Sequence, residues 1–271
     1  MLFRSDRERE VAAEAARLGI DPNRPIVTVH VRELGFRAGA GLTQRSWDLV
    51  RNGKVATYRD AFAALVERGF TVVRLGDSTM TPIECPGVID FTRLSGPKAW
   101  LEVWCTMRST FFIGCDSGPA WLAYLLHIPQ LTVNAVHFRD LTRPTDRIIC
   151  KLAKETATGR VLPISEMLTE DFLRNGFKSG RYEYLDNEPY DIQRAVLDML
   201  NVVAGTEALS SAQAKFNRRL RALEDESALD WSALEGVSVL RRPQGTLSQH
   251  FAKRYYLPAV ADVPTEAGVQ A

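Results

Sequence analysis

Polar residues that could bind an anion stand directly after a hydrophobic run near the middle of the chain. The run Thr110–Cys115 is β-branched and aromatic, which is typical of a buried parallel strand. Asp116, Ser117 and Gly118 follow it, and the next residues have a helical composition up to Pro129. Serine is a good helix N-cap, glycine lets the backbone approach a ligand, and the N–H groups that begin a helix attract phosphate. The segment predicts a phosphate-binding helix start, with an ordinary strand–helix turn as the alternative.

Polar side chains also stand at the ends of three other expected strands. They are His30 and Arg32, then Arg74, Gly76 and Asp77, and last Asn134. Because the carboxyl ends of parallel strands meet at one edge of a sheet, we expect these groups to share a crevice. Arginine matches phosphate oxygens bidentately, so Arg32, Arg74 and the more distant Arg51 with Asn52 suit a diphosphate. For each arginine, a solvated or ion-paired role is the alternative.

Arg74 is the best of these arginines because it interrupts an apolar strand, where a charge needs a partner. We expect Arg74→Ala to weaken binding of a nucleotide diphosphate with little loss of folding. The candidate acid–base residues are His30, Asp77 and Asp116. His30 equally fits a hydrogen-bonded core histidine. The sequence lacks the motifs of zinc hydrolases, P-loops and dinucleotide-binding sites, and Gly114–Gly118 lacks the spacing of a nucleophile elbow. No metal and no cofactor is therefore expected.

Composition narrows the class of protein. The 271 residues are 45% hydrophobic and 25% charged, as in an ordinary globular protein, and the formal net charge of +1 argues against a nucleic-acid partner. The four cysteines show no metal-type spacing, and Cys105 and Cys115 are expected to be buried free thiols in a reducing compartment. No run could span a bilayer and no signal peptide is evident, so we expect a cytoplasmic protein. The basic face of Ser210–Glu224 fits a solvated helix or a peripheral contact with the inner membrane.

Strand and helix patterns alternate along most of the chain. Strands are expected at Pro25–Arg32, Phe70–Leu75, Val88–Phe91, Thr110–Cys115 and from Leu131, with helices between them. This alternation predicts an α/β fold with a Rossmann-like open, mostly parallel sheet covered by helices on both faces. We assign residues 1–203 to this Rossmann-like domain and 204–271 to a helical C-terminal extension with a disordered tail. The long, basic segment Glu33–Asn52 predicts a functional or mobile loop.

Several of these motifs, taken together, resemble a known group of enzymes. The run from Phe111 to Ala123, followed by Ile128-Pro129, resembles the nucleotide-sugar-binding half of GT-B glycosyltransferases such as heptosyltransferases. Val29–Arg32 is similar to the His-x-Arg element of fucosyltransferase-like enzymes. The combination of HVRELGF, Arg51-Asn52, Tyr58, VVRLGD, FFIGCDSG and Asn134 resembles bacterial glycosyltransferases associated with surface polysaccharide loci.

The resemblance implies transfer of a sugar from a nucleotide diphosphate donor to a glycan or lipid-linked acceptor. Arg32 and Arg74 would meet the diphosphate, and Ser117 and Gly118 would offer helix-start N–H groups, so no metal is required. GT-B enzymes have two Rossmann-like domains and this chain is expected to hold one, which leaves the acceptor base unnamed and suggests a missing N-terminal domain. An epimerase or hydrolase of sugar nucleotides, and a non-catalytic nucleotide-sugar-binding module, remain the alternatives.

Overall fold

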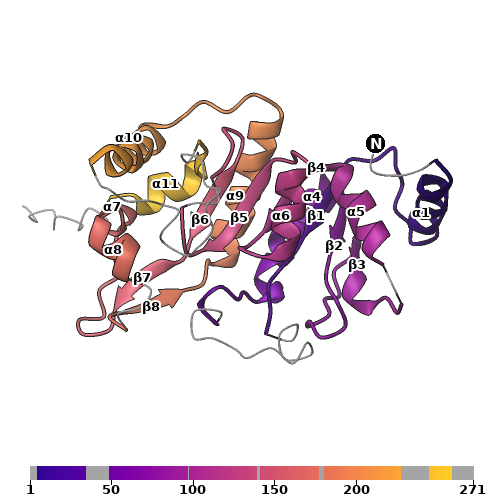
Figure 1. The fold of residues 1–271 in the computed structure, drawn as a ribbon, viewed down its shortest axis with the longest axis horizontal. Coiled ribbons are helices and arrows are strands. Elements are labelled where there is room, and N and C mark those ends of the chain that lie inside the picture. The colour runs from indigo at the N-terminus through magenta and orange to yellow at the C-terminus, as the bar shows by residue number, and fades with distance from the viewer. Residues whose placement is uncertain are drawn as a thin grey trace, which may run out of the picture.

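The computed structural model describes residues 5–34, 49–96, 98–138, 141–176, 180–226 and 244–257. Most of the expected loop Glu33–Asn52 and the expected disordered tail therefore lie outside the described residues. Figure 1 places helix α1 at one end of the molecule and helices α7, α8, α10 and α11 at the other. Among the described residues, no helix is long and apolar enough to cross a membrane.

A parallel sheet of seven strands forms the centre of the structure. Its order is β3-β2-β1-β4-β5-β6-β9, and each neighbouring pair is parallel. The strands are β1 Ile26–Val29, β2 Thr71–Arg74, β3 Val88–Asp90, β4 Ser109–Gly114, β5 Gln130–Ala135, β6 Arg147–Cys150 and β9 Thr246–Leu247. The chain builds outward from β1 in one direction and from β4 in the other. The expected Rossmann-like α/β fold is therefore confirmed, with its strand-order reversal between β1 and β4.

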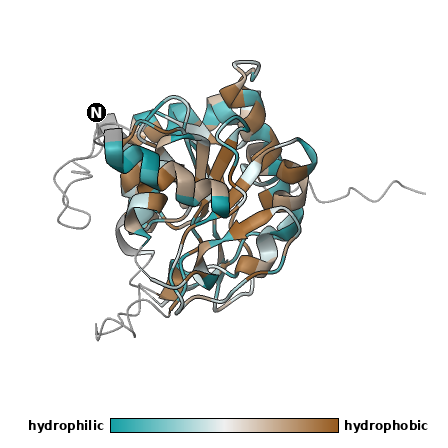
Figure 2. Ribbon diagram, turned by 90° about the vertical axis from the view of Figure 1, so that its right-hand side faces the viewer, coloured by the Kyte–Doolittle hydropathy of each residue, from teal (hydrophilic) through white to brown (hydrophobic). Residues whose placement is uncertain are grey.

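Helices cover both faces of the sheet and bury two separate groups of apolar side chains. On one face lie α1 Ser5–Arg17, α5 Ala99–Met107 and α6 Gly118–Leu125, whose cluster includes Trp104 and Phe112. On the other face lie η1 Val55–Tyr58, α4 Arg59–Glu67, α9 Pro189–Val203, α10 Ser211–Glu226 and α11 Gln249–Tyr255. Figure 2 shows the hydrophobic residues concentrated in the central strands. Burial on both faces explains why these strands are apolar runs rather than alternating ones.

Five elements lie outside the main sheet and its covering helices. The antiparallel hairpin β7 Leu152–Glu155 and β8 Tyr182–Leu185 forms a second, two-stranded sheet. Helices α7 Ile164–Met167 and α8 Glu170–Asn175 lie between its strands in the chain, and the short helix η2 Phe91–Arg93 follows β3. The sequence predicted one helix over Ser165–Asn175. Two short helices form instead, and Thr169 caps the second by accepting a hydrogen bond from the Phe172 N–H.

The segment after residue 203 is not a separate helical extension. Its strand β9 pairs with β6, and Phe216 and Phe251 lie in the same apolar cluster as Ile192 of α9. The predicted boundary at residue 203 therefore separates no second core. Two residues of strand are too short to show a period in sequence, which explains why β9 was missed.

Candidate functional site

A cavity of about 350 Å³ opens where β1 and β4 end, and we call it the strand-end cavity. Its position matches the crevice that ligands occupy in open α/β sheets, beside the reversal of strand order. Its lining residues come from the ends of β1 and β2 and from the beginnings of α5 and α6. They are His30, Arg32, Glu33, Gly76, Asp77, Met80, Lys98, Glu102, Ser117, Gly118 and Pro119. Six residues assigned to the site from sequence are thus brought together here: His30, Arg32, Gly76, Asp77, Ser117 and Gly118.

The β1 side of the cavity carries His30 and Arg32. The Arg32 N–H donates a hydrogen bond to the Cys115 sulfur at 3.3 Å, which ties the end of β1 to the end of β4. His30 is only 6% exposed, and its Nδ1 has no hydrogen-bond partner among the described residues. Burial, with Arg74 and Arg32 nearby, lowers the pKa of His30 to about 4. The imidazole is therefore neutral at pH 7, which makes it a weak base and a hydrogen-bonding group for a ligand.

The β4 side of the cavity is the beginning of α6. Ser117 occupies the N-cap position, but its side chain makes no capping hydrogen bond and is 6% exposed at the cavity. Pro119 lies in the first turn and has no N–H, so this helix start offers fewer backbone donors than one without proline. A Cβ on Gly118 would meet no atom within 4 Å. The fold does not demand glycine at this position, and the missing side chain leaves open space in the cavity.

Acidic and basic groups from two other elements close the cavity. Asp77 follows β2, while Lys98 and Glu102 come from the start of α5. Burial, together with nearby Asp77, raises the pKa of Glu102 above its usual value, although Lys98 opposes this shift. Lys98 Nζ donates to the backbone oxygen of Phe91. The cavity therefore combines two cations, Arg32 and Lys98, with three acidic residues. Of these, Glu33 is paired with Arg74, while Asp77 and Glu102 repel each other.

Arg74 lies outside the strand-end cavity, and its side chain is fully buried. It forms ion pairs of 3.2 Å with both Glu33 and Asp90 and donates to the Thr81 backbone oxygen at 2.5 Å. The expectation that Arg74→Ala would cost little folding stability is therefore wrong, because the substitution would leave Asp90 buried without its cation. The sequence correctly indicated that this charge needs a partner, and the partners are the protein's own carboxylates.

The other predicted residues also contact the protein itself. Asp116 and Arg51 form an ion pair of 2.8 Å in which both side chains are about one-tenth exposed. Asn134, with a positive φ of 54°, exchanges two hydrogen bonds of 2.7 Å with Asn187. Asn52 lines a different cavity. Its backbone oxygen accepts a hydrogen bond of 2.8 Å from Lys151 Nζ. None of these four residues lines the strand-end cavity.

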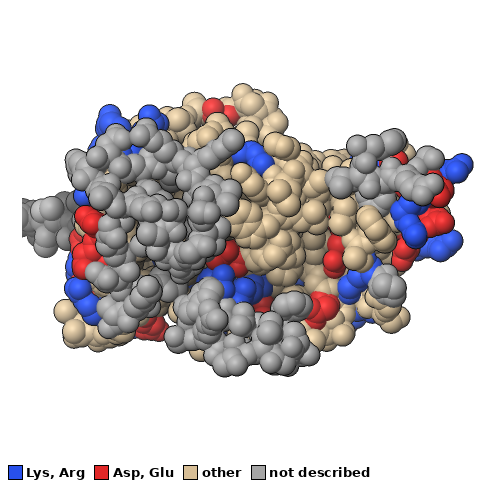
Figure 3. Space-filling model, in the orientation of Figure 1, with Lys and Arg blue, Asp and Glu red and all other residues tan. Residues whose placement is uncertain are grey.

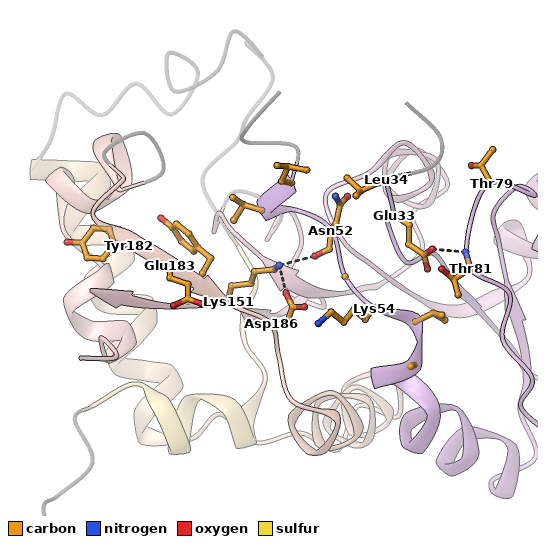
Figure 4. Close-up of a pocket in the computed structure, with 16 residues that line it drawn as sticks. Glu33, Leu34, Asn52, Lys54, Thr79, Thr81, Lys151, Tyr182, Glu183 and Asp186 are labelled. Atoms are coloured by element: carbon orange, nitrogen blue, oxygen red, sulfur yellow. Dashed lines mark hydrogen bonds and ion pairs between the residues drawn. The ribbon is translucent and has the colours of Figure 1, made fainter. Parts of the chain in front are cut away.

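That second cavity, of about 970 Å³, lies between the end of β1, the chain that leads into η1, and the β7–β8 hairpin (Figure 4). We call it the hairpin cavity. Lys151 Nζ also bonds Asp186 at 2.5 Å, so the hairpin is held against the segment that precedes η1. Glu33 lines both cavities and accepts the Thr81 N–H at 2.6 Å. The two cavities therefore share a wall.

Sequence reasoning missed Glu33, Met80, Lys98 and Glu102. Lys98 and Glu102 could have been found from the sequence, because the helix after β3 must begin at the edge of the sheet where β3 ends. The first turn of that helix, which holds Lys98 and Glu102, therefore had to lie near the predicted crevice. Glu33 and Met80 carried no such signal.

All four cysteines are free thiols, and Cys105 and Cys115 are buried as expected. No group of three or more potential metal-binding residues exists within the described ranges. On the face drawn in Figure 3, acidic and basic side chains are interspersed and form no large basic patch among the described residues. In comparisons with known proteins, the sequence matches no family model and has no significant match among curated proteins. Functional inference must therefore start from the chain's own residues and geometry.

Proposed function

We propose that the protein binds a nucleotide diphosphate sugar in the strand-end cavity and transfers its sugar to a glycan or lipid-linked acceptor, as a GT-B-type glycosyltransferase or its donor-binding half. The observation that carries this proposal is the meeting of Arg32, Lys98 and the open Gly118 at the reversal of strand order. Cations and helix-start groups at this place suit phosphate oxygens. The sequence resemblance to surface-polysaccharide glycosyltransferases gives the same donor class.

The proposed transfer uses these groups in a simple way. An acceptor hydroxyl oxygen bonds to the anomeric carbon, the bond from that carbon to the diphosphate breaks, and the diphosphate keeps the electron pair. Arg32 and Lys98 stabilise the charge that develops on the diphosphate. Asp77, whose carboxylate lines the same cavity, takes the proton of the hydroxyl.

A thermal-shift and calorimetric screen of UDP-, GDP- and dTDP-sugars tests the donor site. We expect at least one to bind the wild type, and Gly118→Val to weaken that binding tenfold or more, since its side chain enters open cavity space. Arg32→Gln should weaken binding by about 10- to 100-fold, the usual loss for a charge-assisted hydrogen bond. Arg93→Gln is the matched control, because Arg93 is an exposed arginine paired with Glu84. A wild type that binds none of these compounds, or binding that Gly118→Val leaves unchanged, would refute the donor site.

The pair Asp77 and Glu102 favours a second candidate, an epimerase or hydrolase of sugar nucleotides. A carboxyl with a raised pKa close to a second acidic residue is a common acid–base arrangement. Donor hydrolysis without any acceptor, abolished by Glu102→Gln, would favour the hydrolase. Donor binding without any turnover would favour a non-catalytic nucleotide-sugar-binding module. Sugar transfer that survives Glu102→Gln would favour the glycosyltransferase.

A further inference from the structure

We propose that the hairpin cavity is the acceptor subsite and binds a neutral sugar through its hydroxyl groups and its apolar face. This inference rests on the proposed function, because an acceptor subsite has meaning only beside a sugar donor. It assigns a purpose to the β7–β8 hairpin, which adds no strand to the main sheet yet supplies one wall of the larger cavity.

The position of the hairpin cavity fits a second substrate. Glu33 faces both cavities, and the chain after β2 divides its residues between them: Asp77 and Met80 line the strand-end cavity, while Thr79 and Thr81 line the hairpin cavity. Two substrates that exchange a glycosyl group must lie side by side with little protein between them. The shared wall provides that arrangement.

The lining of the hairpin cavity fits a sugar better than a highly charged ligand. Apolar side chains, including Leu34, Leu49 and Val55, alternate with hydrogen-bonding groups such as those of Thr81 and Asn52. A sugar presents the same mixture, with C–H groups on its faces and hydroxyls at its edges, and mixed linings of this kind are usual for small-molecule sites.

The charged side chains that line the hairpin cavity are largely paired, so the cavity has no strong net charge. Its basic lining residues are Lys54 and Lys151, and its acidic ones are Glu33, Glu183 and Asp186. Lys151 is already bound to Asp186, and Glu33 to Arg74. A neutral ligand would therefore meet no uncompensated field in the hairpin cavity.

The floor of the hairpin cavity is fixed before any ligand arrives. Lys151 bridges the Asn52 backbone and Asp186, and it is only 4% exposed (Figure 4). The next residue, Asn187, donates to the Cys150 backbone oxygen at 2.8 Å and so fastens the hairpin to the end of β6. A preorganised floor reduces the entropy lost on binding.

Octyl glycosides of glucose, galactose, mannose, rhamnose and N-acetylglucosamine are suitable probes, observed by saturation-transfer NMR on the intact chain. The blocking variant is Ala56→Trp, because Ala56 is exposed and lines the hairpin cavity. The matched control is Ala63→Trp, at an exposed position on α4 away from both cavities. Gly118→Val serves as the variant that blocks the strand-end cavity alone.

We expect at least one glycoside to bind the wild type, Ala56→Trp to weaken its binding tenfold or more, and both other variants to retain it within twofold. Affinity for a nucleotide sugar should show the reverse pattern, with loss in Gly118→Val and retention in Ala56→Trp. Glycoside binding that Ala56→Trp leaves intact, or its absence from the wild type across all five probes, would overturn the acceptor subsite. Failure of nucleotide-sugar binding with normal glycoside binding would instead count against the proposed function.

Discussion

The strand ends of the central sheet fall into two kinds. At the ends of β1 and β4, His30, Arg32, Ser117 and Gly118 face an open cavity. At the end of β2, by contrast, Arg74 is fully enclosed by Glu33, Asp90 and Thr81, and at the end of β5 the side chain of Asn134 binds Asn187. All four ends carry polar groups, yet His30, Arg32, Ser117 and Gly118 face a cavity, whereas Arg74 and Asn134 are occupied by the protein. At the end of β2 only the residues that follow Arg74, such as Gly76 and Asp77, reach that cavity.

The difference comes from segments that are distant in sequence. The chain beyond β2 returns to place Asp90 against Arg74, and the chain beyond the β7–β8 hairpin returns to place Asn187 against Asn134. Among the described residues, the ends of β1 and β4 instead border the strand-end cavity, at the reversal of strand order. Substitutions at the closed ends should therefore reduce the free energy of unfolding, and substitutions at the open ends should reduce ligand affinity.

The largest effect on stability is expected from Arg74→Ala. The substitution leaves the buried Asp90, and also Glu33, without their cation. We expect the free energy of unfolding to fall by about 3–5 kcal/mol. Urea denaturation followed by circular dichroism measures it. Arg93→Ala removes an exposed pair, 46% and 84% exposed, and should cost about 0–1 kcal/mol. Equal stability of the two variants would show that the end of β2 is not closed in the sense argued here.

His30 should make stability depend on pH even though it lies at the open end. Its pKa is about 4 in the folded protein against 6.5 in the unfolded chain, so the unfolded chain takes up a proton first as the pH falls. Stability is then fully present above pH 6.5 and is lost between pH 6.5 and 4, by about 3 kcal/mol in total.

Urea denaturation at pH 7.5, 5.5 and 4.5 measures this loss in the wild type and in His30→Gln. The variant has no imidazole to protonate, so its pH dependence over this range should be flatter. His127→Gln, at an exposed position, should keep the wild-type profile. Parallel profiles for His30→Gln and the wild type would show that His30 is not held neutral by burial.

The sequence predicted what depends on local pattern. Apolar runs and helical stripes predicted five of the strands and their covering helices, because burial on both faces leaves a continuous signal. It also predicted polar strand ends, since carboxyl ends of parallel strands share an edge. Whether Arg74 or Arg32 would face solvent could not be predicted, because the answer depends on where Glu33 and Asp90 lie in three dimensions. The short strand β9 and the hairpin pairing were missed for the same reason, as they are set by contacts between distant segments.

The smallest stability effect concerns Asn187→Ala at the closed end of β5. The substitution removes the acceptor of the Asn134 N–H and the donor to the Cys150 oxygen, both buried, at a cost of about 1–3 kcal/mol. Asn134 stays in its left-handed conformation, which asparagine tolerates, but loses one of the two bonds that hold it there. Urea denaturation measures the loss, and calorimetry with the best nucleotide sugar measures affinity. Affinity should be unchanged, since neither asparagine lines the strand-end cavity. A tenfold loss of affinity in a folded Asn187→Ala variant would show that Asn134 contributes to donor binding. The end of β5 would then not differ in role from the ends of β1 and β4.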